Sequence, residues 1–130
     1  MEATSGRSPI RVLLADDDER YLESLRTLVE EQPELSVVAQ ATNGLGAIEA
    51  AETFDVDAAV IDLHMPVVDG VTAVARLRRD HPSLCLIAIT GDREPDLLRA
   101  AHEAGADAVL LKDELVETLV DRLSATRRQA

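Results

Sequence analysis

Cysteine and long apolar runs are both scarce in this chain of 130 residues. The single cysteine, Cys85, has no partner for an intramolecular disulfide and fits a reducing compartment, so we expect a cytoplasmic protein. The longest uninterrupted apolar run covers residues 84–89, far short of the roughly 20 residues that a membrane-spanning helix needs. Residues 1–9 have no apolar centre, which excludes a signal peptide and predicts a flexible N-terminal leader.

Basic residues are also in the minority. The chain has 13 of them against 25 acidic residues, which gives a formal net charge of −12. A surface of this sign repels phosphodiesters, so we expect no direct contact of this domain with nucleic acid or with an anionic membrane. Contact with DNA would require another domain, because the length suits a single domain with one core.

Short apolar runs alternate along the chain with longer stretches of helical period, a pattern typical of β-α-β units and a parallel sheet. The predicted strands are Ile10–Ala15, Ser36–Ala41, Ala58–Leu63, Leu84–Thr90 and Ala108–Leu111. Nearly every strand is apolar on both faces, so helices should cover both sides of the sheet. The predicted fold class is therefore α/β, a doubly wound five-stranded parallel sheet with five helices. Residues 10–125 form this domain, and residues 126–130 are predicted to begin a linker or tail.

Local signals mark several helix ends. The turn at residues 42–44 precedes an alanine-rich helix around residues 47–52, and a further helix is predicted from residue 71 to about residue 79. Pro95 suits the first turn of the fourth helix, and Gly105 suits its end. Asp113 is predicted to cap the last helix.

Polar residues follow several of the predicted strands at the point where each strand ends. They are Asp16 and Asp17, Asp62, Thr90 and Lys112. The carboxyl ends of parallel strands share one edge of a sheet, where ligands bind in this class of fold, so these side chains should converge. Three neighbouring carboxylates repel one another and require a hard divalent cation, for which Mg²⁺ is the natural choice. A carboxylate nucleophile, a metal and an ammonium group together suit phosphoryl transfer.

Simpler explanations differ in strength among these residues. The acidic run 16–19 by itself could complement the dipole of the helix that follows it, and threonine is common in strands. Asp62 is harder to explain away, because a carboxylate that ends so apolar a strand is costly unless it is paired or liganded. Lys112 is the only lysine among the 13 basic residues, and its compact ammonium fits a crowded phosphate site better than a guanidinium does.

From about residue 10 to residue 123 the sequence resembles the receiver domain of bacterial two-component response regulators. Four motifs in this order carry the resemblance: Leu14-Ala15-Asp16-Asp17-Asp18, Ile61-Asp62-Leu63-His64-Met65-Pro66 continuing to Asp69-Gly70, Ile89-Thr90-Gly91, and Gly105-Ala106-Asp107 leading to Leu111-Lys112-Asp113. The resemblance implies the flavodoxin-like fold of receivers. The strand ending Leu111-Lys112-Asp113 looks like the branch of the family that carries a helix-turn-helix DNA-binding output domain.

The resemblance also implies a role for each site residue. Asp62 would accept a phosphoryl group from a sensor histidine kinase, and Lys112 would pair with the phosphoryl oxygens. Mg²⁺ would be held by Asp17, Asp62 and the main-chain carbonyl of His64, with Asp16 acting mostly through water. Thr90 would swing towards the phosphate and change the surface formed by the fourth helix, the fifth strand and the fifth helix. Such a domain is a phosphoacceptor that catalyses at most its own phosphorylation and dephosphorylation, and a homodimer on phosphorylation is a common outcome.

Two features bear on how the family pattern applies here. Many receivers carry an aromatic residue in the fifth strand whose rotamer follows the threonine, whereas this chain has Val109 at that position. His64 and Asp92 occupy the positions that tend to set the lifetime of the phosphate in the family.

Two alternatives remain open from the sequence. One is a stand-alone receiver that relays phosphate or docks on a partner without an output domain. The other, more remote, is a haloacid-dehalogenase-like phosphatase, because Asp16 and Asp18 have the Asp-x-Asp spacing of that class. The residues that follow depart from its pattern, since Glu19 and Arg20 stand where that class has glycine and threonine.

Overall fold

A computed structural model describes residues 8–114 and 116–126 as one parallel sheet between two layers of helices. The strands are β1 (Ile10–Ala15), β2 (Leu35–Ala41), β3 (Ala58–Asp62), β4 (Cys85–Thr90) and β5 (Ala108–Leu111). The helices are α1 (Glu19–Glu30), α2 (Gly44–Thr53), α3 (Gly70–Asp80), α4 (Pro95–Ala104) and α5 (Val116–Ala125). The strand order is β2-β1-β3-β4-β5, with all four neighbouring pairs parallel, so the predicted doubly wound α/β fold is confirmed.

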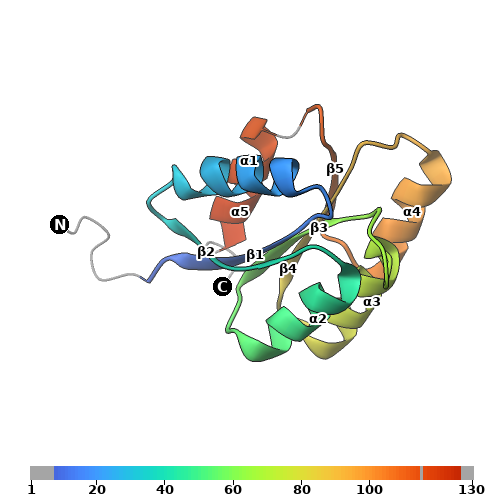
Figure 1. The fold of residues 1–130 in the computed structure, drawn as a ribbon, viewed down its shortest axis with the longest axis horizontal. Coiled ribbons are helices and arrows are strands. Elements are labelled where there is room, and N and C mark those ends of the chain that lie inside the picture. The colour runs from blue at the N-terminus through green and yellow to red at the C-terminus, as the bar shows by residue number, and fades with distance from the viewer. Residues whose placement is uncertain (1–7, 115, 127–130) are drawn as a thin grey trace.

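The sheet has a separate hydrophobic core on each face. Helices α1 and α5 cover one face (Figure 1). There Leu22, Leu25, Leu119 and Leu123 pack on the strands. Helices α2, α3 and α4 cover the other. Side chains of successive strand residues alternate between these two cores, which explains why the central strands are apolar throughout.

Several element boundaries differ from the sequence predictions for local reasons. Helix α2 begins at Gly44, three residues earlier than expected, because the side chain of Asn43 accepts a hydrogen bond from the N–H of Gly46 (2.7 Å) and caps the helix there. Pro95 in the first turn of α4 and Gly105 at its end are confirmed. The carboxylate of Asp113, predicted to cap the last helix, accepts a hydrogen bond from Arg93 (2.9 Å), and residue 115, just before the start of α5 at Val116, lies outside the described residues.

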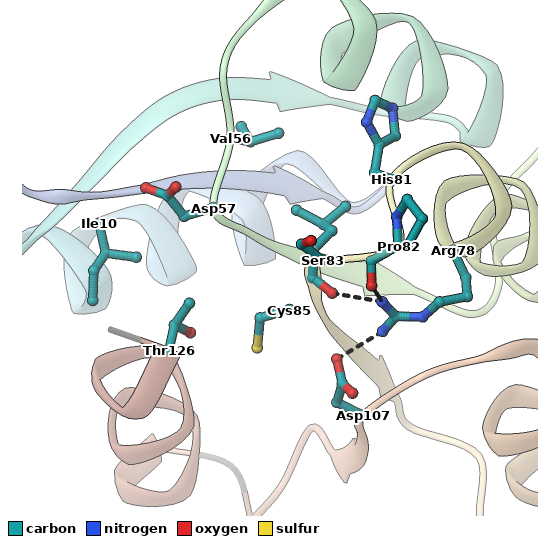
Figure 2. A pocket seen from close by; sticks show the side chains of 11 residues that line it. Ile10, Val56, Asp57, Arg78, His81, Pro82, Ser83, Cys85, Asp107 and Thr126 are labelled. Carbon is teal, nitrogen blue, oxygen red and sulfur yellow. Dashed lines mark hydrogen bonds and ion pairs between the residues drawn. The ribbon is translucent and has the colours of Figure 1, made fainter. Parts of the chain in front are cut away.

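At the edge of the sheet where the strands begin, Arg78 of α3 makes a set of hydrogen bonds, called the clamp below, that joins neighbouring segments. Its guanidinium donates to the carbonyls of Pro82, Leu84 and Gly105 and to the carboxylate of Asp107, at 2.8–3.0 Å. The side chain also lines a cleft of about 810 Å³ at the same edge. Figure 2 shows Arg78 among the other residues that line this cleft. The hydrogen bonds of Arg78 go to groups of its own domain, so the clamp joins α3, β4 and the turn before β5 as a structural device.

Parts of the predicted domain boundaries cannot be compared with the structure. The predicted leader lies outside the described residues except for residues 8 and 9, and the predicted tail lies outside them except for Thr126. Within the described part of the chain, no helix is both long enough and apolar enough to cross a membrane.

Candidate functional site

The predicted site residues converge at the edge of the sheet where the strands end. Asp16 and Asp17 follow β1, Asp62 is the last residue of β3, and Lys112 follows β5. Strands β1 and β3 are neighbours at the centre of the sheet, where the strand order reverses. Parallel sheets place their ligands at this point, so the topology puts the carboxylates where the sequence analysis expected them.

Three carboxylates form the centre of the site. One oxygen from each of Asp16, Asp17 and Asp62 lies within 4.8 Å of the others. Asp16 is fully buried and Asp62 is 3% exposed, whereas Asp17 is exposed to solvent. Two desolvated carboxylates beside a third create a strongly negative position that is open on one side.

The ammonium of Lys112 provides the positive charge in this cluster. Its Nζ lies 2.8 Å from Oδ2 of Asp16 and 3.6 Å from Oδ2 of Asp62. Oδ2 of Asp16 is buried and, among the described residues, accepts no hydrogen bond of regular geometry, so this ion pair is its main compensation. The backbone N–H of Lys112 donates to the carbonyl of Thr90 (2.8 Å), which fixes the start of the lysine side chain beside β4.

Asp62 holds its proton more strongly than an ordinary aspartate does. Burial is the main cause and the charge of Asp16 adds to it, so that together they raise the pKa of Asp62 to about 6. Lys112 and the hydrogen bond from the N–H of His64 act in the opposite direction without cancelling the effect. At neutral pH the carboxylate is therefore ionised, but at a cost that an additional cation would relieve.

The loop after β1 orients Asp16 and removes Asp18 from the site. Oδ1 of Asp16 accepts a hydrogen bond from the N–H of Asp18 (2.9 Å). The carboxylate of Asp18 caps α1 by accepting from the N–H groups of Arg20 and Tyr21 at 3.0 and 3.3 Å. Asp16 and Asp18 therefore do not share the site as the Asp-x-Asp pair of a phosphatase would, and the carboxylates that share it are Asp16, Asp17 and Asp62.

The loop after β3 is folded tightly over Asp62. The N–H of His64 donates to Oδ1 of Asp62 (3.3 Å), so the backbone of His64 lies directly beside the carboxylate. Helix α3 begins so close to this strand end that a side chain at Gly70 would overlap main-chain atoms of Asp62 and Leu63. Val67, in the same loop, has a positive φ of 72° and is 75% exposed, an unusual conformation for a β-branched residue.

Thr90 lies beside this group at the end of β4, one residue beyond Ile89, which pairs with Asp62 in the sheet. Its side chain is buried, and its hydroxyl oxygen accepts a hydrogen bond from the N–H of Asp92 (3.0 Å). The carboxylate of Asp92 lies 3.3 Å from Nε2 of His64. The loops after β3 and β4 are thus in contact through the two residues that the family resemblance singled out.

Two contacts at this edge were not predicted from the sequence. Arg93 pairs with Asp113 (2.9 Å) and Glu114 (3.5 Å), which links the loop after Thr90 to the loop after Lys112. Tyr21, the third residue of α1, places the centroid of its ring 4.3 Å from the ammonium of Lys112. Burial and the charges of Asp16 and Asp62 raise the pKa of Tyr21 to about 12, so its hydroxyl stays neutral. Both contacts join residues that are far apart in the chain, and no local sequence signal indicates either of them.

The donor set fits a magnesium ion. Hard carboxylate oxygens from Asp16, Asp17 and Asp62 lie within reach of one ion, and the buried Oδ2 of Asp16 lacks a regular hydrogen-bond donor. Mg²⁺ usually takes few protein ligands and keeps several waters, which suits a cluster open to solvent at Asp17.

Comparisons with known proteins identify the family. The family model of the response regulator receiver domain matches residues 12–124. The chain is 35% identical over 119 residues to the nitrate/nitrite response regulator protein NarP of Escherichia coli (strain K12), an alignment that covers 91% of this chain and 55% of NarP. The chain therefore spans about half the length of this relative.

Solved structures agree with this assignment. The signal receiver domain of NarL from Mycobacterium tuberculosis has a TM-score of 0.86 at 26% identity, covering 93% of this chain and 98% of that one. The RcsB response regulator of Salmonella typhimurium has a TM-score of 0.85 at 26% identity, covering 94% of this chain and 62% of that one, and a further RcsB structure contains two dimers bound to two parallel DNAs. The fold, the site and these matches show that the chain belongs to the response regulator receiver domain family and is related to transcriptional regulators of the NarL and NarP type.

Proposed function

We propose that Asp62 accepts a phosphoryl group from a phosphohistidine on a sensor histidine kinase and that the domain is a phosphorylation-dependent signalling switch. The observation that carries this proposal is the position of Asp62: a buried carboxylate at the central strand end, with the Lys112 ammonium 3.6 Å away and two further carboxylates beside it. An unpaired buried carboxylate would lower the stability of the fold, whereas a buried carboxylate beside a cation site and an ammonium is suited to accept a phosphoryl group.

The chemistry of the proposed transfer is a single displacement at phosphorus. An oxygen of Asp62 forms a bond to phosphorus while the bond between phosphorus and the imidazole nitrogen breaks. The leaving imidazole keeps the electron pair and takes up a proton, and the product is an acyl phosphate on Asp62. Mg²⁺, when held by Asp16, Asp17, Asp62 and the carbonyl of His64, would supply positive charge to the phosphoryl oxygens.

Lys112 and Thr90 would respond to the added charge. The ammonium of Lys112 already lies between the carboxylates of Asp16 and Asp62, and a phosphoryl group on Asp62 would offer it a stronger partner. The hydroxyl oxygen of Thr90 accepts a hydrogen bond from the backbone N–H of Asp92, an arrangement in which the hydroxyl proton can still donate towards a phosphoryl oxygen. A shift of Thr90 would then move the surface formed by α4, β5 and α5.

Val109 in β5 gives this surface no aromatic side chain to follow Thr90. It is half-buried and packs against the core on the α2, α3 and α4 side of the sheet. The ion pairs of Arg93 with Asp113 and Glu114 connect the loops at the ends of β4 and β5, so they offer another route for the change.

The wider role follows from the relatives. We infer that the domain acts in the cytoplasm, that it controls an attached helix-turn-helix output domain, and that DNA is contacted through that domain, since the receiver itself carries a net charge of −12. The relation to NarP and the RcsB dimers on DNA support this inference and a homodimer on phosphorylation. A stand-alone receiver would share the site but not the output.

Intact-mass spectrometry tests the proposal. The native chain and Asp62→Asn would be incubated with a small phosphoryl donor, with and without Mg²⁺. We expect one phosphoryl adduct on the native chain that requires Mg²⁺, is removed by hydroxylamine and is absent from the variant. A folded native chain that acquires no adduct, or an adduct that persists in Asp62→Asn, would overturn the assignment.

A further inference from the structure

Tyr21 in α1 makes close contact with Lys112, 91 residues away in the chain. The ammonium of Lys112 lies over the ring of Tyr21, 4.3 Å from its centroid. A cation over the face of an aromatic ring is attracted by the quadrupole of the ring. The ammonium is thus bounded by the carboxylate of Asp16 at 2.8 Å, that of Asp62 at 3.6 Å and the ring.

The same tyrosine also reaches the backbone of Lys112. Its hydroxyl donates a long hydrogen bond of 3.4 Å to the carbonyl of Lys112, while the N–H of Lys112 donates to the carbonyl of Thr90 at 2.8 Å. The peptide groups on both sides of Lys112 are therefore anchored. At 3.4 Å the tyrosine hydrogen bond is weak, so the ring contributes more to the contact than the hydroxyl does.

The start of α1 holds the ring in place. Asp18 caps the helix and accepts a hydrogen bond from the N–H of Tyr21 itself, at 3.3 Å. The ring is half-buried and packs against the core beneath α1 and α5. A lysine side chain has four rotatable bonds and is strongly hydrated, so a fixed ring on one side restricts where its ammonium can lie.

We propose that Tyr21 is a positioning residue for phosphoryl transfer, whose ring holds the Lys112 ammonium over the carboxylates and excludes water from one side of it. This inference rests on the proposed phosphoacceptor role of Asp62. Tyr21 does not touch the reacting atoms and acts through Lys112.

The composition of the chain makes the contact directly observable. Lys112 is the only lysine, so lysine labelled with ¹³C gives the signals of one side chain. Tyr21 and Phe54 are the only residues with a benzene-type ring, since the chain has one tyrosine, one phenylalanine and no tryptophan, and Phe54 lies at the far end of α2. An upfield shift of the Lys112 ε-methylene protons that disappears when the ring of Tyr21 is removed therefore reports on Tyr21.

Three variants separate the possible roles. Tyr21→Leu keeps an apolar side chain against the core but removes the ring, Tyr21→Phe keeps the ring and removes the hydroxyl, and Phe54→Leu is the matched control. We expect the ε-methylene signals of Lys112 to lie upfield in the native chain, in Tyr21→Phe and in Phe54→Leu. In Tyr21→Leu they should return to the position of a free lysine.

Phosphorylation rates provide the functional measurement. With a small phosphoryl donor and Mg²⁺, we expect Tyr21→Leu to react about three- to tenfold more slowly than the native chain, the range that corresponds to a partly exposed cation–π contact. Tyr21→Phe and Phe54→Leu should react within about twofold of the native rate. Rescue by phenylalanine would show that the ring, and not the packing volume, sets the rate.

Each contrary result has a definite meaning. A native Lys112 signal without an upfield shift, or a Tyr21→Leu variant with the native rate, overturns the positioning role. Equal loss of rate in Tyr21→Phe and Tyr21→Leu assigns the effect to the hydroxyl and overturns the role of the ring. If the native chain takes no phosphoryl group while its lysine signal shifts as expected, the phosphoacceptor role fails and the Tyr21–Lys112 contact stands.

Discussion

Replacing Asp62 by asparagine should make the magnesium-free domain more stable. Folding raises the pKa of Asp62 from 3.8 to about 6, mainly through burial and then through the charge of Asp16. The folded protein therefore binds this proton more tightly than the unfolded chain does. The associated stabilisation is fully present below about pH 4 and is lost as the pH rises through about 6.

The size of the effect follows from the shift. Two pKa units at about 1.4 kcal/mol each set an upper bound of about 3 kcal/mol at pH 7. Solvent reaches the cluster at the exposed Asp17, so we expect Asp62→Asn to raise the free energy of unfolding by about 1–3 kcal/mol. For a domain of this size, ~2 kcal/mol corresponds to an increase in Tm of roughly 6–8 °C.

Denaturant unfolding between pH 4 and pH 8, without Mg²⁺, measures this difference. The advantage of Asp62→Asn should be near zero at pH 4, grow through pH 6 and remain constant above it. The matched control is Asp121→Asn, which removes an exposed carboxylate in α5 and should change stability little at any pH. An Asp62→Asn variant that is no more stable than the native chain at pH 7 would refute the electrostatic account of the site.

Three further results are expected. Mg²⁺ affinity should decrease about tenfold per pH unit below pH 6, because the ion and a proton compete for Asp62. Calorimetry in buffers of different ionisation enthalpy should detect the released proton. An affinity that does not change with pH would contradict this. Lys112→Met should lower stability by about 1–3 kcal/mol without Mg²⁺ by leaving the buried Asp16 unpaired, and Asp16→Asn in the same chain should restore it. Arg78→Leu should lower the free energy of unfolding, measured with denaturant, by about 2–4 kcal/mol because it removes the hydrogen bonds of the clamp. The phosphorylation rate of the folded fraction should stay native, since the clamp lies at the opposite edge of the sheet.

The sequence was sufficient to predict the fold and the gathering of the site residues, for one physical reason. Apolar strands with helices between them must form a parallel sheet, and parallel strands carry whatever follows them to a common edge. Asp16, Asp62 and Lys112 meet there although 96 residues separate the first from the last. Their roles in phosphoryl transfer remain predictions that the mass measurement addresses.

The sequence did not predict the contacts between different loops at the edge of the sheet where the strands end. Asp113 has the residue type and spacing of a helix cap, and nothing local indicates that its carboxylate also pairs with Arg93 from another loop. Tyr21 has the spacing of a core residue, and nothing local indicates that its ring faces Lys112. The sequence of β2 is also typical of a buried strand, yet its central residues are half-exposed because β2 is an outer strand of the sheet. The order of the strands in the sheet cannot be predicted from the sequence of any one strand.

The ion pairs of Arg93 with Asp113 and Glu114 lie in the open, with all three side chains about 60% exposed or more. Ions in solution screen such pairs over a Debye length of about 8 Å at physiological ionic strength, whereas the pair of Lys112 with the fully buried Asp16 is largely protected. Added salt should therefore loosen the link between the two loops while leaving the carboxylate cluster intact. Ionic strength would then weaken the connection between the loops after β4 and β5 more than it weakens the pair of Lys112 with Asp16.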